Sequence, residues 1–247
     1  YYMVGGMPEA VNVFIETNDA NSVREVQREI LLAYKNDISK HTTKEQSQRI
    51  AMVWNSMPSQ LSKENKKFIY GVVKKGGRAN EFELAIQWLI DAGLIIKVGR
   101  ITTPSMPLKV YEDLSAFKLY LLDVGLLGAM AEINPVQLLL PNDMKESKGM
   151  FTENFVCTQL VTQFNSSLFY YSKENSTLEI DFFVQKETQI VPIEVKAEIN
   201  VKSKSLSTIL QNNEEMFGVR FSMNQYRQQE KIVNLPLYCA EVYFKED

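Results

Sequence analysis

The sequence has one histidine, two cysteines and no phosphate-binding loop. His41 is the only histidine among 247 residues, which excludes histidine-dependent catalytic triads and most zinc sites. No string of the form GxxxxGK[ST] occurs, so this chain by itself is not expected to hydrolyse ATP. Cys157 and Cys239 lie in apolar stretches. That setting predicts buried thiols in a reducing compartment.

Long apolar runs are also missing. The longest, AFKLYLLDVGLLGAM, is interrupted by Lys118 and Asp123 and is too short to cross a bilayer. The first residues show no signal-peptide pattern, so we expect a cytoplasmic protein with no membrane partner. The chain opens on Tyr1 rather than methionine, which suggests a fragment. Hydrophobic residues make up 45% of the sequence, and this balance favours a folded globular chain over a disordered one.

Two short stretches, LEIDFFVQ and IVPIEVKA, carry the most informative pattern. Side chains alternate between the faces of a strand, so Glu194 and Lys196 share one face of the second stretch. The polar residues QKETQ between the stretches predict a turn and therefore a hairpin. This hairpin would gather Asp181, Glu194 and Lys196, a set that can hold Mg²⁺ and activate a water against a phosphodiester. The alternative is a solvated strand face that carries the same letters by chance.

An upstream stretch, FTENFVCTQLVTQF, has the periodicity of a helix. Val156, Leu160 and Phe164 follow Glu153 at three, seven and eleven residues, so all four share one stripe. A carboxylate on an inward stripe is costly unless it is paired or bound to a metal. Glu153 is therefore a fourth candidate site residue.

The net charge of −3 hides an uneven distribution along the chain. Residues 59–110 hold nine Lys or Arg against four acids, a local charge of +5. A basic surplus in a short segment is typical of nucleic-acid contact. A charged surface around an ordinary helical domain would give the same count.

The same segment has the order of a winged helix. KENKKFIYGVV predicts a short helix, EFELAIQWLIDAG a second helix that ends at Gly93, and LIIKVGRI and LKVYE the two strands of a wing. The second helix would be the recognition helix, with base contacts near its start. The candidate DNA-binding residues are Lys74, Lys75, Arg78, Lys97 and Arg100. A winged helix that serves only as a packing or protein-contact module is the alternative.

The N-terminal residues are predicted to be mostly helical, and Gly5-Gly6-Met7-Pro8 to form a turn. We expect three parts: a helical lid-like segment over 1–58, a winged helix over 59–111, and an α/β domain over 112–247. The overall class is α/β, or α+β when all three parts are counted together.

Several segments carry a family resemblance that spans most of the chain: YYMVGGMPEAV, FIYGVVKKGGRANEFELAIQWLIDAGLI, FTENFV, EIDFF and PIEVKA. They resemble the C-terminal part of a prokaryotic AAA-type ATPase family. In that family a P-loop ATPase precedes a winged helix and a domain of unknown function with a PD-(D/E)xK nuclease-like fold. The resemblance implies that residues 1–58 correspond to the ATPase lid and that ATP would bind only in a missing N-terminal domain. That ATPase domain would be one partner of this chain.

The resemblance also implies roles for the site residues. Glu153, Asp181, Glu194 and Lys196 match the catalytic positions, with Asp181 and Glu194 as ligands of Mg²⁺. Three functions then remain open: a metal-dependent nuclease acting on DNA, a non-catalytic DNA-binding or regulatory module, and an assembly platform that forms a homo-oligomer.

Overall fold

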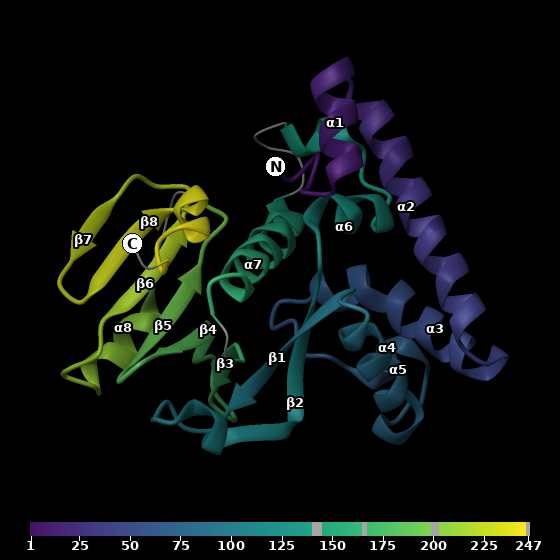
Figure 1. Ribbon diagram of the computed structural model, residues 1–247. Helices are drawn as coiled ribbons and strands as arrows, with labels where there is room; N and C mark the ends of the chain where they lie inside the picture. The colour runs from purple at the N-terminus through teal and green to yellow at the C-terminus, as the bar shows by residue number, and fades with distance from the viewer. Residues whose placement is uncertain (140–144, 165–166, 199–202, 246–247) are drawn as a thin grey trace. The chain divides into compact units, whose positions relative to one another are not determined.

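The protein, seen here as a computed structural model that describes residues 1–139, 145–164, 167–198 and 203–245, is a mixed α/β chain (Figure 1). These residues form eight α-helices and one mixed sheet of eight strands. The chain divides into two compact units. The first comprises Tyr1–Ile96 and Leu119–Phe155, and the second Lys97–Lys118 and Val156–Asp247. The predicted boundaries at residues 58 and 111 stay predictions.

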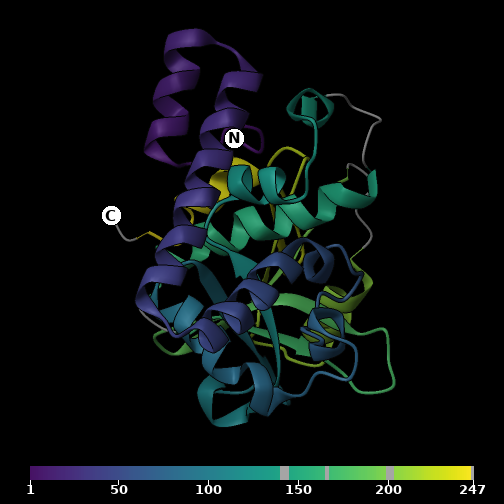
Figure 2. The same cartoon turned by 90° about the vertical axis from the view of Figure 1, so that its right-hand side faces the viewer.

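The first unit is mainly helical. Its elements include α1 (Pro8–Thr17), α2 (Ala20–His41), α3 (Lys44–Leu61), α4 (Tyr70–Val73), α5 (Ala79–Asp91), α6 (Val124–Met130) and the short 3₁₀ helix η2 (Pro135–Leu139). Figure 2 shows α1 and α2 lying side by side. The sequence begins these helices with local signals: Asp19 caps α2, and Thr43 with Gln46 forms a reciprocal capping box at α3.

The turn before α1 is fixed by a buried carboxylate. Gly5 has a φ of +73°, and a Cβ atom added there would collide with the carboxylate of Asp123. Asp123 accepts hydrogen bonds from the backbone N–H of Gly6 at 2.7 Å and of Leu126 at 2.8 Å, so it caps α6 and holds the turn together. Burial raises the pKa of Asp123, and these hydrogen bonds oppose that shift. The turn was predicted at residues 5–8, but in the structure it lies at residues 2–4 with a bend at Gly6, and Pro8 already begins α1.

One other local expectation in this unit is wrong. The predicted helix over residues 63–73 shortens to α4, because Lys66 takes a left-handed φ of +49° that breaks the helical path. Helix α3 continues through Pro58 to Leu61. His41 is the last residue of α2.

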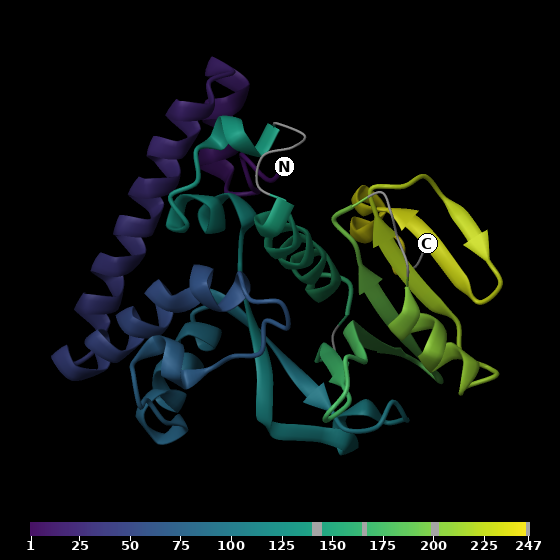
Figure 3. The ribbon, with the colours of Figure 1, turned by 180° about the vertical axis from the view of Figure 1, so that it is seen from behind.

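The sheet belongs mostly to the second unit, although β1 begins and β2 ends in the first. The strand order is β2-β1-β3-β4-β5-β6-β8-β7. The strands are β1 (Ile95–Ile101), β2 (Glu112–Leu121), β3 (Phe169–Ser172), β4 (Glu179–Lys186), β5 (Gln189–Val195), β6 (Gly218–Ser222), β7 (Arg227–Gln229) and β8 (Ile232–Pro236). Strands β5, β6 and β8 run parallel, so their C-terminal ends meet at one edge (Figure 3).

One face of this sheet is covered by α8 (Lys204–Gln211). Leu206, Ile209 and Leu210 of α8 pack on apolar side chains from β1, β3 and β4, among them Ile101 and Phe183. Helix α7 (Lys145–Val161) begins in the first unit and ends in the second. The short 3₁₀ helix η1 covers Leu108–Tyr111, and η3 covers Leu237–Glu241. This packing fixes the faces of the central strands.

The predicted hairpin is confirmed, because β4 and β5 pair antiparallel on either side of a turn at residues 187 and 188. The helices predicted around Glu153 and after Arg78 are confirmed as α7 and α5. The predicted wing strand LKVYE is wrong. Residues 108–111 form η1, and strand β2 starts only at Glu112. The cis peptide bond before Pro107 lies at the start of this turn.

Two further sequence-based expectations concern the burial of the cysteines and the lack of a membrane span. Cys157 is buried as predicted, whereas Cys239 is only half-buried, so the expectation of a second buried thiol is wrong. Among the residues described, no helix combines the length and apolar character that a membrane span needs.

Replacing Gly5 by Ala should destabilise the first unit by about 3 kcal/mol, because left-handed strain adds to the collision with Asp123. Gly76→Ala is the matched control. Gly76 has a similar φ of +77° with nothing near its missing Cβ atom, so the strain alone should cost about 1 kcal/mol. Urea unfolding of both variants measures the difference. Equal losses would show that the turn does not depend on the Asp123 contact.

Candidate functional site

The β4–β5 hairpin of the second unit brings three of the predicted site residues together. The ladder pairs Phe182 with Ile193, and Val195 lies two residues beyond that pair. The backbone N–H of Val195 donates to Oδ2 of Asp181 at 2.8 Å. Val195 is the residue between Glu194 and Lys196. Asp181 therefore reaches across the hairpin to the backbone of the E-x-K segment.

A bulge in β4 places Asp181 at this point. Strand β3 pairs Phe169 with Phe183 but Tyr171 with Ile180, so Tyr170 alone faces both Asp181 and Phe182. The extra residue bends the strand and re-aims its side chains. Simple alternation along LEIDFFVQ missed this bulge, because nothing in the sequence letters marks it.

Glu194 is buried next to its lysine. The residue is 4% exposed, and its Oε1 lies 2.9 Å from Nζ of Lys196, whose side chain is about one-third exposed. Among the residues described, Oε2 of Glu194 has no hydrogen-bond partner. A buried carboxylate oxygen without a donor is costly. Glu194 therefore offers an unused acceptor at the C-terminal end of β5.

A buried arginine lies beside Glu194 on the next strand. The register pairs Glu194 with Arg220, whose guanidinium donates to Asn234 Oδ1, Ser203 Oγ and Gln229 Oε1. Burial lowers the pKa of Arg220, and the charge of Glu194 opposes that shift. These hydrogen bonds hold Arg220 in place.

Carboxylate and main-chain oxygens are the ligands that a hard divalent cation prefers. Asp181 and Glu194 supply carboxylate oxygens, and the Val195 carbonyl is a third oxygen of the same segment. The unused Oε2 of Glu194 is the observation that favours a cation here. Within the described ranges there is no group of three or more acidic, histidine or cysteine side chains that could hold a metal. Any cation at this point would depend on two carboxylates, main-chain oxygen and water.

Glu153 lies on α7 in the first unit and is already paired there. Its Oε1 is 2.6 Å from Nζ of Lys66, and its Oε2 accepts from the hydroxyl of Tyr120 at 3.1 Å. Both charged side chains are about nine-tenths buried. The expectation that a buried Glu153 needs a partner is confirmed. Sequence reasoning missed Lys66 as that partner, because 87 residues separate the two.

The five candidate DNA-binding residues differ in how far they are neutralised. In the first unit, Lys74 pairs with Glu81 at 2.6 Å. Lys75 and Arg78 are exposed, and no ion pair of their side chains occurs among the described residues. Arg78 occupies the N-cap of α5.

The other two candidates belong to the second unit. Arg100 binds Asp113 at 2.6 Å and Glu174 at 3.2 Å. Lys97 lies over the ring of Phe117, with Nζ 4.7 Å from its centroid. Counting charges in the sequence could not show this neutralisation of Arg100, since its acids are distant in the chain.

A second charged cluster of the second unit was missed. Lys118 is almost completely buried, with Nζ 2.6 Å from Oε1 of Glu179 and 4.9 Å from the ring centroid of Tyr170. Burial raises the pKa of Tyr170 to about 12, and its hydroxyl has no partner among the described residues. The interruption of an apolar run by Lys118 was the available signal.

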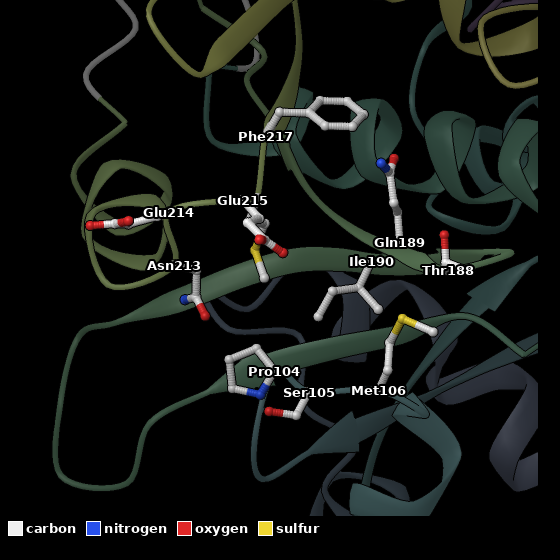
Figure 4. Close-up of a pocket in the computed structure, with 11 residues that line it drawn as sticks. Pro104, Ser105, Met106, Thr188, Gln189, Ile190, Asn213, Glu214, Glu215 and Phe217 are labelled. Atoms are coloured by element: carbon white, nitrogen blue, oxygen red, sulfur yellow. The ribbon is translucent and has the colours of Figure 1, made fainter.

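An open pocket of about 620 Å³ lies at the other end of β5 (Figure 4). Met106, Ile190 and Phe217 give it apolar walls, and Glu214 and Glu215 give it negative charge. The pocket starts where β5 starts, whereas Glu194 and Lys196 lie where β5 ends. It is therefore separate from the carboxylate site.

Comparison with known families assigns the chain. It belongs to the family described as domain of unknown function DUF8612, which matches residues 1–137. A second domain of unknown function, DUF4143, matches residues 148–240 and is typically found at the C-terminus of AAA-type ATPases. No curated protein and no solved structure matches the chain.

Removal of Lys66 should test whether the Glu153 pair holds the first unit together. Lys66→Met strands a buried carboxylate and should cost about 3–5 kcal/mol of unfolding free energy. The double variant Lys66→Met, Glu153→Leu should recover most of that loss, because no charge is left uncompensated. Arg49→Met, which breaks an exposed pair with Glu45, should cost about 0.5 kcal/mol or less. Chemical denaturation that finds equal losses for Lys66→Met and Arg49→Met would contradict this role.

Proposed function

We propose that this chain is the C-terminal part of an AAA-type ATPase and that its hairpin site cleaves DNA phosphodiesters with Mg²⁺. One observation carries the proposal: the Asp181 carboxylate is fixed on the amide between Glu194 and Lys196, beside a buried carboxylate oxygen that has no donor among the described residues. The match to DUF4143 supports the same region. In this proposal the second unit carries a PD-(D/E)xK-like site and residues 59–111 act as a winged helix.

Each residue has a separate task in the proposed reaction. Asp181 and Glu194 hold the cation, which supplies charge stabilisation and an acidified water. Lys196 lies against Glu194, with its Nζ 2.9 Å from Oε1 of that carboxylate. In this reaction it would orient or deprotonate the attacking water and stabilise the negative charge that develops on the phosphoryl oxygens.

Glu153 can act in the proposed reaction only if its carboxylate is released from its present partners. The family resemblance gives it a place in the catalytic set, yet Lys66 and Tyr120 already satisfy both of its oxygens. Any use of Glu153 in catalysis would first require Lys66 to move away. We therefore base the cleavage proposal on Asp181, Glu194 and Lys196.

The alternative is a non-catalytic module that binds DNA or regulates the ATPase. The observation in its favour is that the Glu194–Lys196 pair can be a structural salt bridge. In this alternative, loss of Lys196 lowers stability rather than rate. The ATPase domain and its ATP belong to the proposal in either form, because this sequence has no phosphate-binding loop of its own.

Cleavage should depend on the two carboxylates and on a hard cation. Nicking of supercoiled plasmid with Mg²⁺ or Mn²⁺ should fall at least about 100-fold in Asp181→Asn and in Glu194→Gln. Lys196→Gln should slow cleavage while calorimetric binding of Mg²⁺ persists. Glu187→Gln, which changes an exposed acid in the turn of the same hairpin, should cut like the parent chain.

Melting temperatures recorded alongside separate loss of chemistry from loss of fold. The assay is run with this chain and with the chain joined to its ATPase domain, with and without ATP. If the folded parent chain binds no Mg²⁺ in the presence of DNA and leaves plasmid intact in every arm, the nuclease proposal is wrong.

Duplex DNA should bind through Lys75 and Arg78, because these side chains are exposed and not neutralised by acids among the described residues. Lys75→Ala combined with Arg78→Ala should reduce the slope of log affinity against log salt by about 1.8, or about 0.9 for each lost phosphate contact. Lys74→Ala is the matched control and should change the slope less, since Lys74 already pairs with Glu81. Fluorescence anisotropy over a salt series measures both. If Lys74→Ala reduces the salt slope as much as the double variant does, Lys75 and Arg78 are not the main DNA contacts.

A further inference from the structure

Exposed apolar side chains occur in the connection after β6, in η3 and in the two residues that follow η3 in the second unit. Tyr238 is 73% exposed, Tyr226 62%, Met223 61% and Val242 55%, and Tyr243 is 36% exposed. We call these five residues the tyrosine patch. Large aromatic side chains with this exposure are unusual unless they contact another molecule.

The patch is held by buried neighbours. Asn234 is 1% exposed, and its amide donates to the backbone oxygen of Gln225 at 2.9 Å, next to Tyr226. The ring of Tyr243 meets Phe244 edge-on at 4.9 Å and Phe221 at 6.4 Å. Burial is the main cause that raises the pKa of Tyr243. The charge of the nearby Tyr226 raises it further. The backbone before Tyr226 and the ring of Tyr243 are therefore held in place, which lowers the ordering entropy that binding would cost at these two residues.

The patch lies at the same sheet edge as Lys196. Strands β5, β6 and β8 are parallel, and the backbone N–H of Lys196 donates to the oxygen of Phe221, near the end of β6. The register pairs Ser222 with Pro236, and the patch begins with the residue after Ser222. Figure 3 shows β6 and β8 running toward the short helix η3. Aromatic rings and the proposed cleavage site thus share one edge.

Two cations, Arg227 and Lys245, lie near the rings in the sequence, together with one exposed acid, Glu241. Arg227 follows Tyr226 and is exposed, with no ion pair among the described residues, and Lys245 is exposed near Tyr243. Flat aromatic faces beside positive charge suit a strand whose bases are unpaired, because each base can stack on a ring while phosphates meet the cations. A duplex hides its base faces and cannot stack in this way.

We propose that the tyrosine patch binds single-stranded nucleic acid by base stacking and feeds that strand to the carboxylate site. This inference rests on the proposed function for its purpose, although the stacking itself needs neither metal nor cleavage. Tyr226 and Tyr238 are the two principal platforms, since they are the most exposed rings of the patch.

The experiment measures binding of the whole chain to a fluorescent single-stranded oligonucleotide and to a duplex of equal length, in EDTA. The parent chain should prefer the single strand. Each of Tyr226→Ala and Tyr238→Ala should weaken single-strand binding about tenfold. Tyr226→Phe and Tyr238→Phe should bind within about twofold of the parent, because stacking requires the ring and not the hydroxyl. Leu114→Ala, which removes a 76% exposed side chain elsewhere in the second unit, should have no effect.

Opposite results overturn the inference. Unchanged single-strand affinity in both Tyr226→Ala and Tyr238→Ala, or equal losses in the Phe variants, would exclude stacking. Sedimentation of the same variants tests the competing occupant: if the Ala changes alter self-association but not nucleic-acid binding, the patch is a protein interface instead.

The outcome is also separable from that of the proposed nuclease. Asp181→Asn should abolish cleavage but keep single-strand binding. If no form of the chain cuts DNA but the tyrosines bind single strands, the nuclease proposal fails and the patch stands. If the chain cuts duplex DNA without binding single strands, the patch inference fails alone.

Discussion

The burial of carboxylates beside lysines is the constraint on which both units depend. Glu153 is paired with Lys66, Glu179 with Lys118, and Glu194 with Lys196. A buried charge without such a partner would cost several kcal/mol, so these pairs determine which segments must come together. Glu194 differs from Glu153 because one of its oxygens is left without a donor among the described residues, whereas both oxygens of Glu153 are used. That difference, rather than the presence of acids, distinguishes a candidate binding group from a structural one.

Local patterns in the sequence predicted the hairpin and its three polar residues, because strand alternation and turn composition act over a few residues. They did not predict the bulge that places Asp181 and Phe182 opposite Tyr170, since a bulge arises from how β4 pairs with both neighbours. The predicted helix over residues 63–73 is wrong for a similar reason. Its residues have ordinary helix propensities, but a buried contact with Glu153 coincides with a left-handed conformation at Lys66. Tertiary partners distant in sequence decided both cases.

Charge counting has the same limit. The surplus of +5 over residues 59–110 predicted a DNA-binding surface. However, Lys74 is paired with an acid of the same segment, and Arg100 is paired with two acids outside it. Exposed pairs of this kind add little stability, yet they remove cations from the set that phosphates can use. Lys75 and Arg78 are exposed and have no acid beside them among the described residues, so their positive charges stay available to phosphates.

The acidic balance of residues 111–247, twelve Lys or Arg against nineteen acids, would by itself argue against nucleic-acid contact there. The distribution of charge along β5 changes that conclusion. Glu214 and Glu215 lie at the pocket where β5 begins, while Lys196 lies where it ends, at the edge that also carries Tyr226 and Arg227. Stacking on tyrosine depends on ring area rather than net charge, and two or three local cations suffice to place phosphates beside it. A domain with a net negative charge can therefore still present one edge suited to an unpaired strand.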